Sequence, residues 1–195
     1  MRPGKTGKNA GGSAFMAAIP FRNRIIFWCL ALGGAAFDLW TKAVIFRKVG
    51  PPGSDSVPVV PNILELRTSY NTGALWGMGG NLPQSSLIFA MLSILACVMI
   101  VWWLFWQKAA RDFWLTVALG LIMAGAMGNC YDRLVFHHVR DFVYFHIDPL
   151  NFHCAIFNFA DNMLVAGAVI LVLLALRAEP QTEEASSAET VPAGP

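Results

Sequence analysis

Residues 157–176 read FNFADNMLVAGAVILVLLAL, and Asp161 carries the only charge in this stretch. A helix needs about 20 mostly apolar residues to cross the hydrocarbon core of a bilayer, so the stretch predicts a transmembrane helix. An ionisable side chain is costly inside a membrane and marks a functional site by default. Asp161 is therefore the first candidate functional residue.

Three earlier stretches have a similar length and hydrophobicity: about 25–46, 87–106 and 113–131. The chain of 195 residues is 56% hydrophobic and 13% charged, whereas soluble domains are about 25% charged. We therefore predict an all-α membrane protein with four transmembrane helices, in one domain over 22–176. A net charge of +2 gives no reason to expect a nucleic-acid partner.

The first stretch also fits a secretory signal peptide, because Arg22 and Arg24 precede its apolar run. Signal peptides usually occupy about the first 15–30 residues, however, and this run lies further along the chain. If the helix continues beyond the run, Asp38 and Lys42 fall four residues apart on one face. We therefore interpret the stretch as a retained helix.

The two long loops, about 47–82 and 132–156, contain fewer lysines and arginines than the two ends of the chain and the short connection at 107–112 taken together. By the positive-inside rule, both termini are then cytoplasmic and the two long loops face outward. The ends, 1–21 and 177–195, are rich in small and polar residues, and we expect them to be disordered tails.

The outer loops contain two extended segments. Residues 57–66 combine prolines with β-branched residues, and residues 139–147, which include Asp141, alternate in the manner of a strand. We expect a small extracytoplasmic β-rich cradle and loop on the membrane surface. Three apolar side chains are expected at the interface with lipid: Trp40, Trp76 and Leu82.

Asp141 and Asp161 are separated by one short excursion of the chain, so contact between them at the outer surface is feasible. Two carboxylates about 4 Å apart repel by about 4 kcal/mol at an effective dielectric of about 20, and they then share one proton. The charged partner can act as a base towards water while the protonated partner polarises a carbonyl. The pair favours activation of water for amide hydrolysis.

Several polar residues fall at the outer helix ends or in the outer loops. They are Asn71, Asn129, Arg133, Asn158, Asp38 and Lys42. An asparagine can hold a carboxylate or a substrate backbone, and an arginine offers a fork of donors. Each asparagine could equally well cap a helix end. A pair such as Asp38 and Lys42 is more often structural than catalytic. Asp132 and Asp148 are interpreted as solvated loop acids outside the site.

Histidine and cysteine give little indication of a metal site. The four histidines fall in one outer loop without the spacing of a metal-binding motif, and the four cysteines show no CxxC pair. We expect surface and packing roles for these residues, and we predict no metal and no organic cofactor.

Five motifs follow one another along the chain. They are DLWTK at 38–42, NTGALWG at 71–77, GAMGNCYDR at 125–133, VRDF at 139–142 and FNFAD at 157–161. In this order, over roughly 22–176, they resemble the lipoprotein signal peptidase (signal peptidase II) family. The resemblance implies an aspartyl endopeptidase of the bacterial inner membrane that removes the signal peptide from diacylglyceryl-modified prolipoproteins. It would cut just before the lipidated cysteine, with its active site on the periplasmic side.

The resemblance also implies roles for individual residues, with Asp141 and Asp161 as the catalytic pair. The residues that match substrate-binding or site-supporting positions are Asn71, Gly73, Asn129, Arg133, Asn158, Ala160, Asp38 and Lys42. Trp76 replaces a more usual phenylalanine, and Arg140 stands where an apolar residue is commoner; the first could narrow the lipid groove and the second could alter the pKa of the pair. The implied partners are lipid-modified prolipoproteins and membrane lipid, and we expect a monomer.

Two other functions use the same kinds of residue. A small proton-coupled transporter could relay protons through Asp38 and Asp161, but the second apolar stretch is free of ionisable residues. A presenilin-type intramembrane protease would carry both a Tyr-Asp and a Gly-x-Gly-Asp motif, and Tyr131-Asp132 supplies only the first. Hydrolysis at the outer membrane surface is the main prediction.

Overall fold

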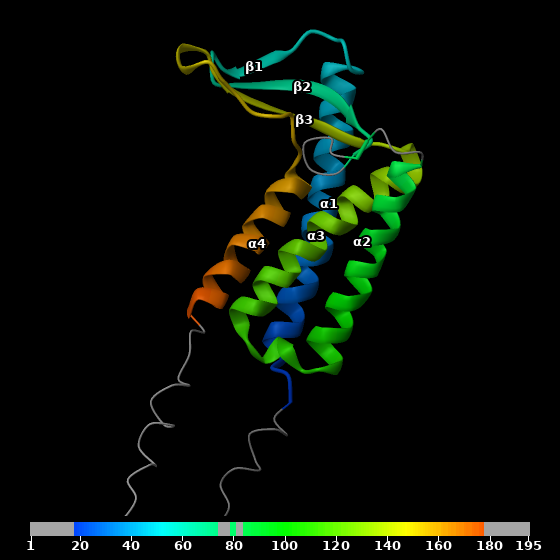
Figure 1. Ribbon diagram of the computed structural model, residues 1–195, viewed down its shortest axis with the longest axis vertical. Coiled ribbons are helices and arrows are strands. Elements are labelled where there is room, and N and C mark those ends of the chain that lie inside the picture. The colour runs from blue at the N-terminus through cyan, green and yellow to red at the C-terminus, as the bar shows by residue number, and fades with distance from the viewer. Residues whose placement is uncertain (1–17, 74–78, 81–83, 178–195) are drawn as a thin grey trace, which may run out of the picture.

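Four helices run along the length of the molecule (Figure 1), and the computed structural model describes residues 18–73, 79–80 and 84–177. The helices are α1 (Phe21–Val49), α2 (Ser85–Val101, continued by a π-helical segment, η3, over Trp102–Trp106), α3 (Phe113–Phe136) and α4 (Phe159–Arg177). Among the described residues these four are long and apolar enough to cross a membrane. The predicted four-helix membrane protein is confirmed. The positions of Trp76 and Leu82, and most of the two predicted tails, lie outside the described residues.

α3 is the central helix, because it packs against α1, α2 and α4. Small residues on α3 allow the close approach: a Cβ added at Gly125 would overlap the backbone carbonyl of Ala160 on α4. The outer helices instead expose large apolar side chains such as Leu92 of α2 and Val172 of α4. Such extended apolar surface is typical of a face that contacts lipid.

Two helices extend beyond their predicted spans. α1 covers Phe21–Val49 rather than 25–46, and α3 continues past the predicted end at 131 to Phe136. The last turns of α3 carry Asp132 and Arg133, which lower the hydropathy of the sequence there. The helix nevertheless continues because both side chains find partners within the protein, as described below.

A four-stranded antiparallel sheet covers the end of the bundle opposite to both ends of the described chain (Figure 1). Its strands lie in the order β1 (Val57–Val60), β2 (Leu64–Asn71), β3 (Val139–Ile147) and β4 (Phe152–His153). The predicted strand over 139–147 is confirmed as β3, whereas the predicted extended segment 57–66 turns at 61–63 and supplies β1 and the start of β2. In the β2–β3 register Ser69 faces Asp141, and the last residue of β2, Asn71, faces the first of β3. The sheet therefore places Asp141 and Asn71 at the end of the helix bundle that it covers.

Candidate active site

Asp161 lies in the first turn of α4 and is held there by a reciprocal pair of hydrogen bonds with Asn158. The backbone N–H of Asn158 donates to Asp161 Oδ2 at 3.1 Å, and the backbone N–H of Asp161 donates to Asn158 Oδ1 at 3.0 Å. This is the arrangement of a capping box, in which the residue before a helix and the third residue within it satisfy each other's backbone. The sequence Asn-Phe-Ala-Asp therefore starts the helix and orients the Asp161 carboxylate.

Asp141 reaches the same place from β3. Its Oδ1 accepts a hydrogen bond from Asn158 Nδ2 at 2.6 Å, and its Oδ2 accepts one from Asn71 Nδ2 at 3.2 Å. Asp141 is only 2% exposed, whereas Asp161 is partly exposed. Since Asn158 contacts both carboxylates, the structure brings the two predicted acids into one site.

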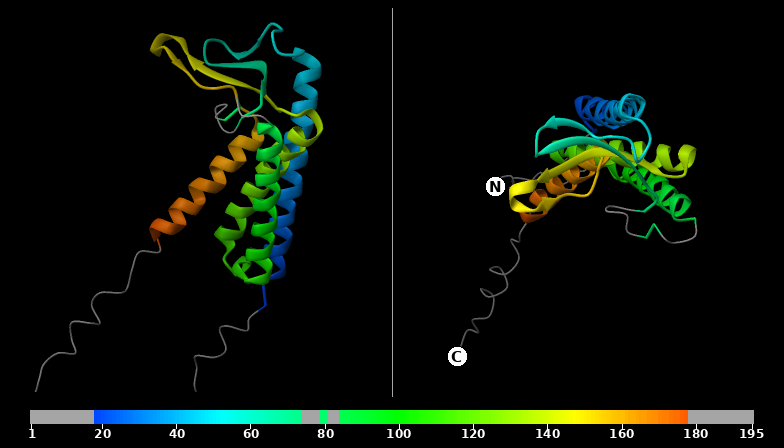
Figure 2. Two further views of the ribbon diagram at one scale, coloured as in Figure 1. Left: turned by 45° about the vertical axis from the view of Figure 1, so that its right-hand side comes forward. Right: turned by 90° about the horizontal axis from the view of Figure 1, so that it is seen from above.

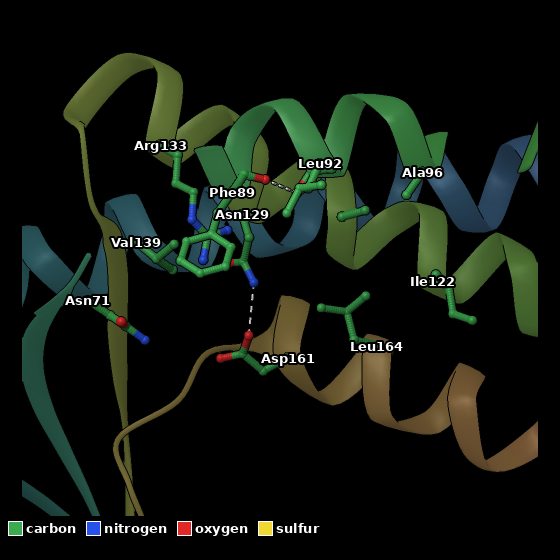
Figure 3. A pocket seen from close by; sticks show the side chains of 12 residues that line it. Asn71, Phe89, Leu92, Ala96, Ile122, Asn129, Arg133, Val139, Asp161 and Leu164 are labelled. Atoms are coloured by element: carbon green, nitrogen blue, oxygen red, sulfur yellow. Dashed lines mark hydrogen bonds between the residues drawn. The ribbon is translucent and has the colours of Figure 1, made fainter. Parts of the chain in front are cut away.

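Asn129 of α3 holds the Asp161 carboxylate (Figure 3). Its Nδ2 donates to Asp161 Oδ1 at 2.8 Å. Its Oδ1 accepts from Lys42 Nζ at 3.0 Å and from Asn158 Nδ2 at 3.2 Å. Because a lysine can only donate, the contact with Lys42 fixes which end of the Asn129 amide faces Asp161.

Arg133 holds the turn that carries Asn71. Its Nη2 donates to the carbonyl of Gly73 at 2.7 Å, and the Gly73 N–H in turn donates to Asn71 Oδ1 at 2.9 Å. The guanidinium also lies over the ring of Phe89 on α2, 5.4 Å from its centroid. Arg133 and Gly73, both predicted as site residues, thus orient the amide that contacts Asp141.

Asp38 and Lys42 of α1 form a fully buried ion pair at 2.7 Å, one helical turn apart as predicted. Lys42 Nζ also lies 3.2 Å from Asp132 Oδ2 on α3, and Asp38 Oδ1 accepts a hydrogen bond from the Ala160 N–H at 2.8 Å. A Cβ at Gly128 would overlap the Asp38 carboxylate, so a glycine is needed there. The pair ties α1 to α3 and to the start of α4.

The interpretation of Asp132 as a solvated loop acid is wrong. Asp132 is fully buried on α3, and besides Lys42 it binds Arg140: Arg140 Nη2 lies 2.7 Å from Oδ1, and the Arg140 backbone N–H donates to Oδ2 at 3.0 Å. Asp132 therefore fixes the residue that precedes Asp141 to the end of α3. The predicted third span ends at 131, one residue before Asp132. A span continued to 136 would contain Asp132, and an ionisable residue inside a membrane span is a candidate functional residue. The side chain of Asp148 lies outside the described part of the chain.

Arg140, the unusual neighbour of Asp141, forms an ion pair with Asp132. Its guanidinium carbon also lies 4.3 Å from the centroid of the Phe136 ring. Its charge is therefore compensated by Asp132. The influence of Arg140 on the pKa of the pair stays a prediction.

Three pockets open beside the acids. One, of about 300 Å³, is lined by Asp161, Asn129 and Arg133, and Figure 3 shows these side chains facing it from α3 and α4. Its apolar lining comes from α2, α3 and α4 and includes Phe89, Leu92, Ile122 and Leu164. A second, of about 310 Å³, is lined by Asp141 and residues of β2. A third, of about 210 Å³, is lined by Asp161 and by the segment 154–157 that precedes α4. Asn71 lines all three, and the acids lie between the apolar first pocket and the more polar second one.

Burial raises the pKa of Asp141 to about 7, and the negative charge of Asp161 raises it as well. The hydrogen bonds from Asn158 and Asn71 and the charge of Lys42 act in the opposite direction. At neutral pH a large fraction of Asp141 is therefore protonated. This provides the shared proton that a pair of carboxyl groups needs for acid–base chemistry.

Two of the four histidines lie on strands of the sheet. His146 of β3 and His153 of β4 face each other in register, and both rings stack with Tyr144. Within the described part of the chain, no group of three His, Cys, Asp or Glu residues is placed to hold a metal ion.

The family model of signal peptidase (SPase) II matches residues 30–177, which include every residue of the site. The chain belongs to the signal peptidase II family. The lipoprotein signal peptidase of Rhodopirellula baltica is 38% identical over 169 residues, covering 80% of this chain and 74% of that one. The lipoprotein signal peptidase of Desulfitobacterium hafniense (strain DSM 10664 / DCB-2) is 40% identical over 133 residues, covering 66% and 82%.

A solved bacterial membrane enzyme has the same fold, with a TM-score of 0.72 and 28% identity over 87% of this chain and 97% of that one. The resemblance drawn from the five motifs is thus confirmed. Neither the family nor these relatives support the alternative of a proton-coupled transporter.

Replacing Asp132 with asparagine should destabilise this signal peptidase II, because Arg140 loses its ion pair and Lys42 keeps one acid, Asp38, in place of two. Breaking a buried ion pair costs about 3–5 kcal/mol. We expect a lower unfolding temperature in detergent and, at a temperature where both proteins are folded, cleavage reduced by about tenfold. Asp55→Asn, in the exposed loop before β1, is the matched control and should leave both values unchanged. Equal stability of the two variants would contradict the anchoring role of Asp132.

Proposed function

We propose that this signal peptidase II is an aspartyl endopeptidase in which Asp141 and Asp161 activate one water molecule. As a member of its family it is a membrane protease of lipoprotein processing. The proposed substrates are diacylglyceryl-modified prolipoproteins, cut just before the lipidated cysteine. The observation that carries the proposal is Asn158, which donates to Asp141 through its side chain and to Asp161 through its backbone.

The two acids have different surroundings, which support different roles. Asp141 is buried and has a pKa of about 7, so it can hold the shared proton. Asp161 is partly exposed to the pocket at the N-terminus of α4, where the helix dipole stabilises an anion. We assign the acid to Asp141 and the base to Asp161. The proton is assigned to Asp141 Oδ2, whose 3.2 Å contact with Asn71 is the longer of its two hydrogen bonds.

The reaction then proceeds with one water between the carboxyl groups. Asp161 takes a proton from the water as its oxygen attacks the scissile carbonyl carbon, and Asp141 gives its proton to the carbonyl oxygen. In the second step the C–N bond breaks and Asp161 delivers the proton it gained to the leaving amine. Asp141 recovers a proton from the hydroxyl that becomes a carboxyl group. Both acids end in their initial state.

The surrounding residues are proposed to position the acids and the substrate backbone through polar side chains or, at Gly73 and Ala160, through backbone groups. These are Asn71, Gly73, Asn129, Arg133, Asn158, Ala160, Asp38 and Lys42. Asn129 and Asn158 restrain the Asp161 carboxylate, and the buried Asp38–Lys42 pair supports the helix start that presents it. Acids held in fixed orientation need little rearrangement to reach the transition state.

The apolar pocket beside Asp161 is proposed to receive the lipidated end of the substrate. Its walls on α2, α3 and α4 are mostly apolar and include Phe89, Leu92, Ile122 and Leu164. Each buried CH₂ of an acyl chain contributes about 0.8 kcal/mol to binding. A diacylglyceryl group would thereby place the cysteine beside the acids, while an unmodified cysteine would lack this affinity.

We propose that the sheet and the acids face the periplasm and that both termini are cytoplasmic. Both ends of the described chain lie at the end of the bundle away from the sheet (Figure 1). In the sequence, the two tails and the short second connection together carry more lysine and arginine than the two long loops. The organisation into a membrane domain over 22–176 with two tails, and a monomeric state, are proposed with it.

Asp141→Asn and Asp161→Asn should each abolish cleavage of a diacylated prolipoprotein, because either change removes one of the two proton-transferring groups. We expect at least about a 10³-fold loss, in the range of removing a catalytic acid or base. Asp55→Asn should cleave normally, and the unlipidated precursor should be a poor substrate for all three proteins. The measurement is a gel-based cleavage assay with purified enzyme; normal cleavage by either active-site variant would refute the pair.

The cleavage rate should fall as the pH rises above about 7, because Asp141 is active only while it holds its proton and its pKa is raised to about 7. Asn71→Ala removes a hydrogen bond that favours the charged form of Asp141. In that variant the pKa of Asp141 should rise further, and the decline should move to higher pH although the maximal rate is lower. The pH profile of kcat/KM measures both effects; a decline that moves to lower pH would contradict the assignment of the acid.

A further inference from the structure

A second apolar cavity, of about 440 Å³, lies between α1, the sheet and the start of α4. Neither carboxylate of the active site lines it, and none of its lining residues is charged. The lining residues are Trp40, Thr41, Val44, Ile45, Val59, Leu64, Leu66, Phe142, Val143, Phe157, Phe159 and Asn162. Seen from above, the sheet lies between α1 and α4 (Figure 2). The cavity is thus distinct from the pocket between α2, α3 and α4 that holds Asp161.

The cavity is continuous with surface that faces lipid. Trp40 of α1 lines it and is 62% exposed, and Phe37, one turn earlier on the same transmembrane helix, is 46% exposed. On the sheet side, Val59 of β1 lines the cavity and is 52% exposed. Hydrocarbon that surrounds the helices therefore has direct access to the cavity.

A cation stands at the end of this apolar face. Val44 and Ile45 line the cavity, and Lys48 follows them by four and three residues, which places it on the same face of α1 about one turn closer to the helix end. Lys48 is exposed, and the ion pairs among the described residues do not include it. An apolar cavity with a cation one turn beyond it matches an amphiphile with an acyl chain and an anionic head.

We propose that this cavity binds one acyl chain of a membrane glycerophospholipid whose phosphate contacts Lys48. The lipid group of the substrate is a poorer match because it carries no phosphate, and because the bond to be cut must reach Asp141 and Asp161. The aromatic rings of Phe142 and Phe159 pack against each other at 5.7 Å in the cavity wall. A bound lipid would therefore contact the neighbour of Asp141 without entering the active site.

The test is native mass spectrometry of the full chain with phosphatidylglycerol or with a diacylglycerol of the same acyl chains. Val44→Trp fills the cavity and should reduce retention of both lipids. Lys48→Gln should weaken phosphatidylglycerol about fivefold, the value of one basic residue near an anionic lipid, and leave the diacylglycerol unchanged. Val172→Trp on the exposed face of α4 and Lys108→Gln in the link at the opposite end of the bundle are the matched controls and should change neither.

Three results would overturn the proposal. Equal losses in the controls would show general lipid contact only, and undiminished phosphatidylglycerol binding by Lys48→Gln would remove the phosphate contact. Displacement of phosphatidylglycerol by a diacylglyceryl peptide would assign the cavity to the substrate. Cleavage activity and the unfolding temperature of each variant report its folding, so failure here is distinguishable from failure of the catalytic proposal.

Discussion

The arrangement of the site depends on Lys42, because an ammonium group with no access to water must be surrounded by acids and amide oxygens. Its Nζ contacts Asp38 of its own helix, and Asp132 and Asn129 of α3. Each of these partners also binds another element. Asp38 accepts a hydrogen bond from the backbone at the start of α4, and Asn129 donates one to the Asp161 carboxylate. Asp132 accepts one from the backbone of Arg140, the residue before Asp141 on β3. One buried charge therefore fixes α1, α3, α4 and the sheet relative to one another at the site.

The two acids at this junction are the same residue type in unlike surroundings. Asp141 is itself buried on β3, where removal from water favours its neutral form, and Asp161 lies at a helix start that opens to a pocket. Asn158 bridges them and is at the same time the cap of α4. The element that begins the last transmembrane helix thus also sets the geometry of the chemistry.

Much of this site was predictable from the sequence, since charges inside apolar stretches are conspicuous and alternation marks a strand. Those two signals identified Asp161, Asp38, Lys42 and the strand that carries Asp141. The sequence does not reveal the burial of Asp132, because Asp132 and Arg133 lower the hydropathy at the end of α3 and the predicted span therefore stops at 131. Its compensation by Lys42 and Arg140 joins residues from separate elements, and no local pattern reveals a contact between distant segments.

The proton that Asp141 keeps up to about pH 7, because burial raises its pKa, can be measured directly. Infrared difference spectroscopy of the purified enzyme follows the C=O stretch of protonated carboxyl groups as the pH is raised. A band that disappears with a midpoint near pH 7 and is missing in Asp141→Asn is the expected result. A band that titrates near the ordinary aspartate value of about 4, or one that persists in Asp141→Asn, would contradict it.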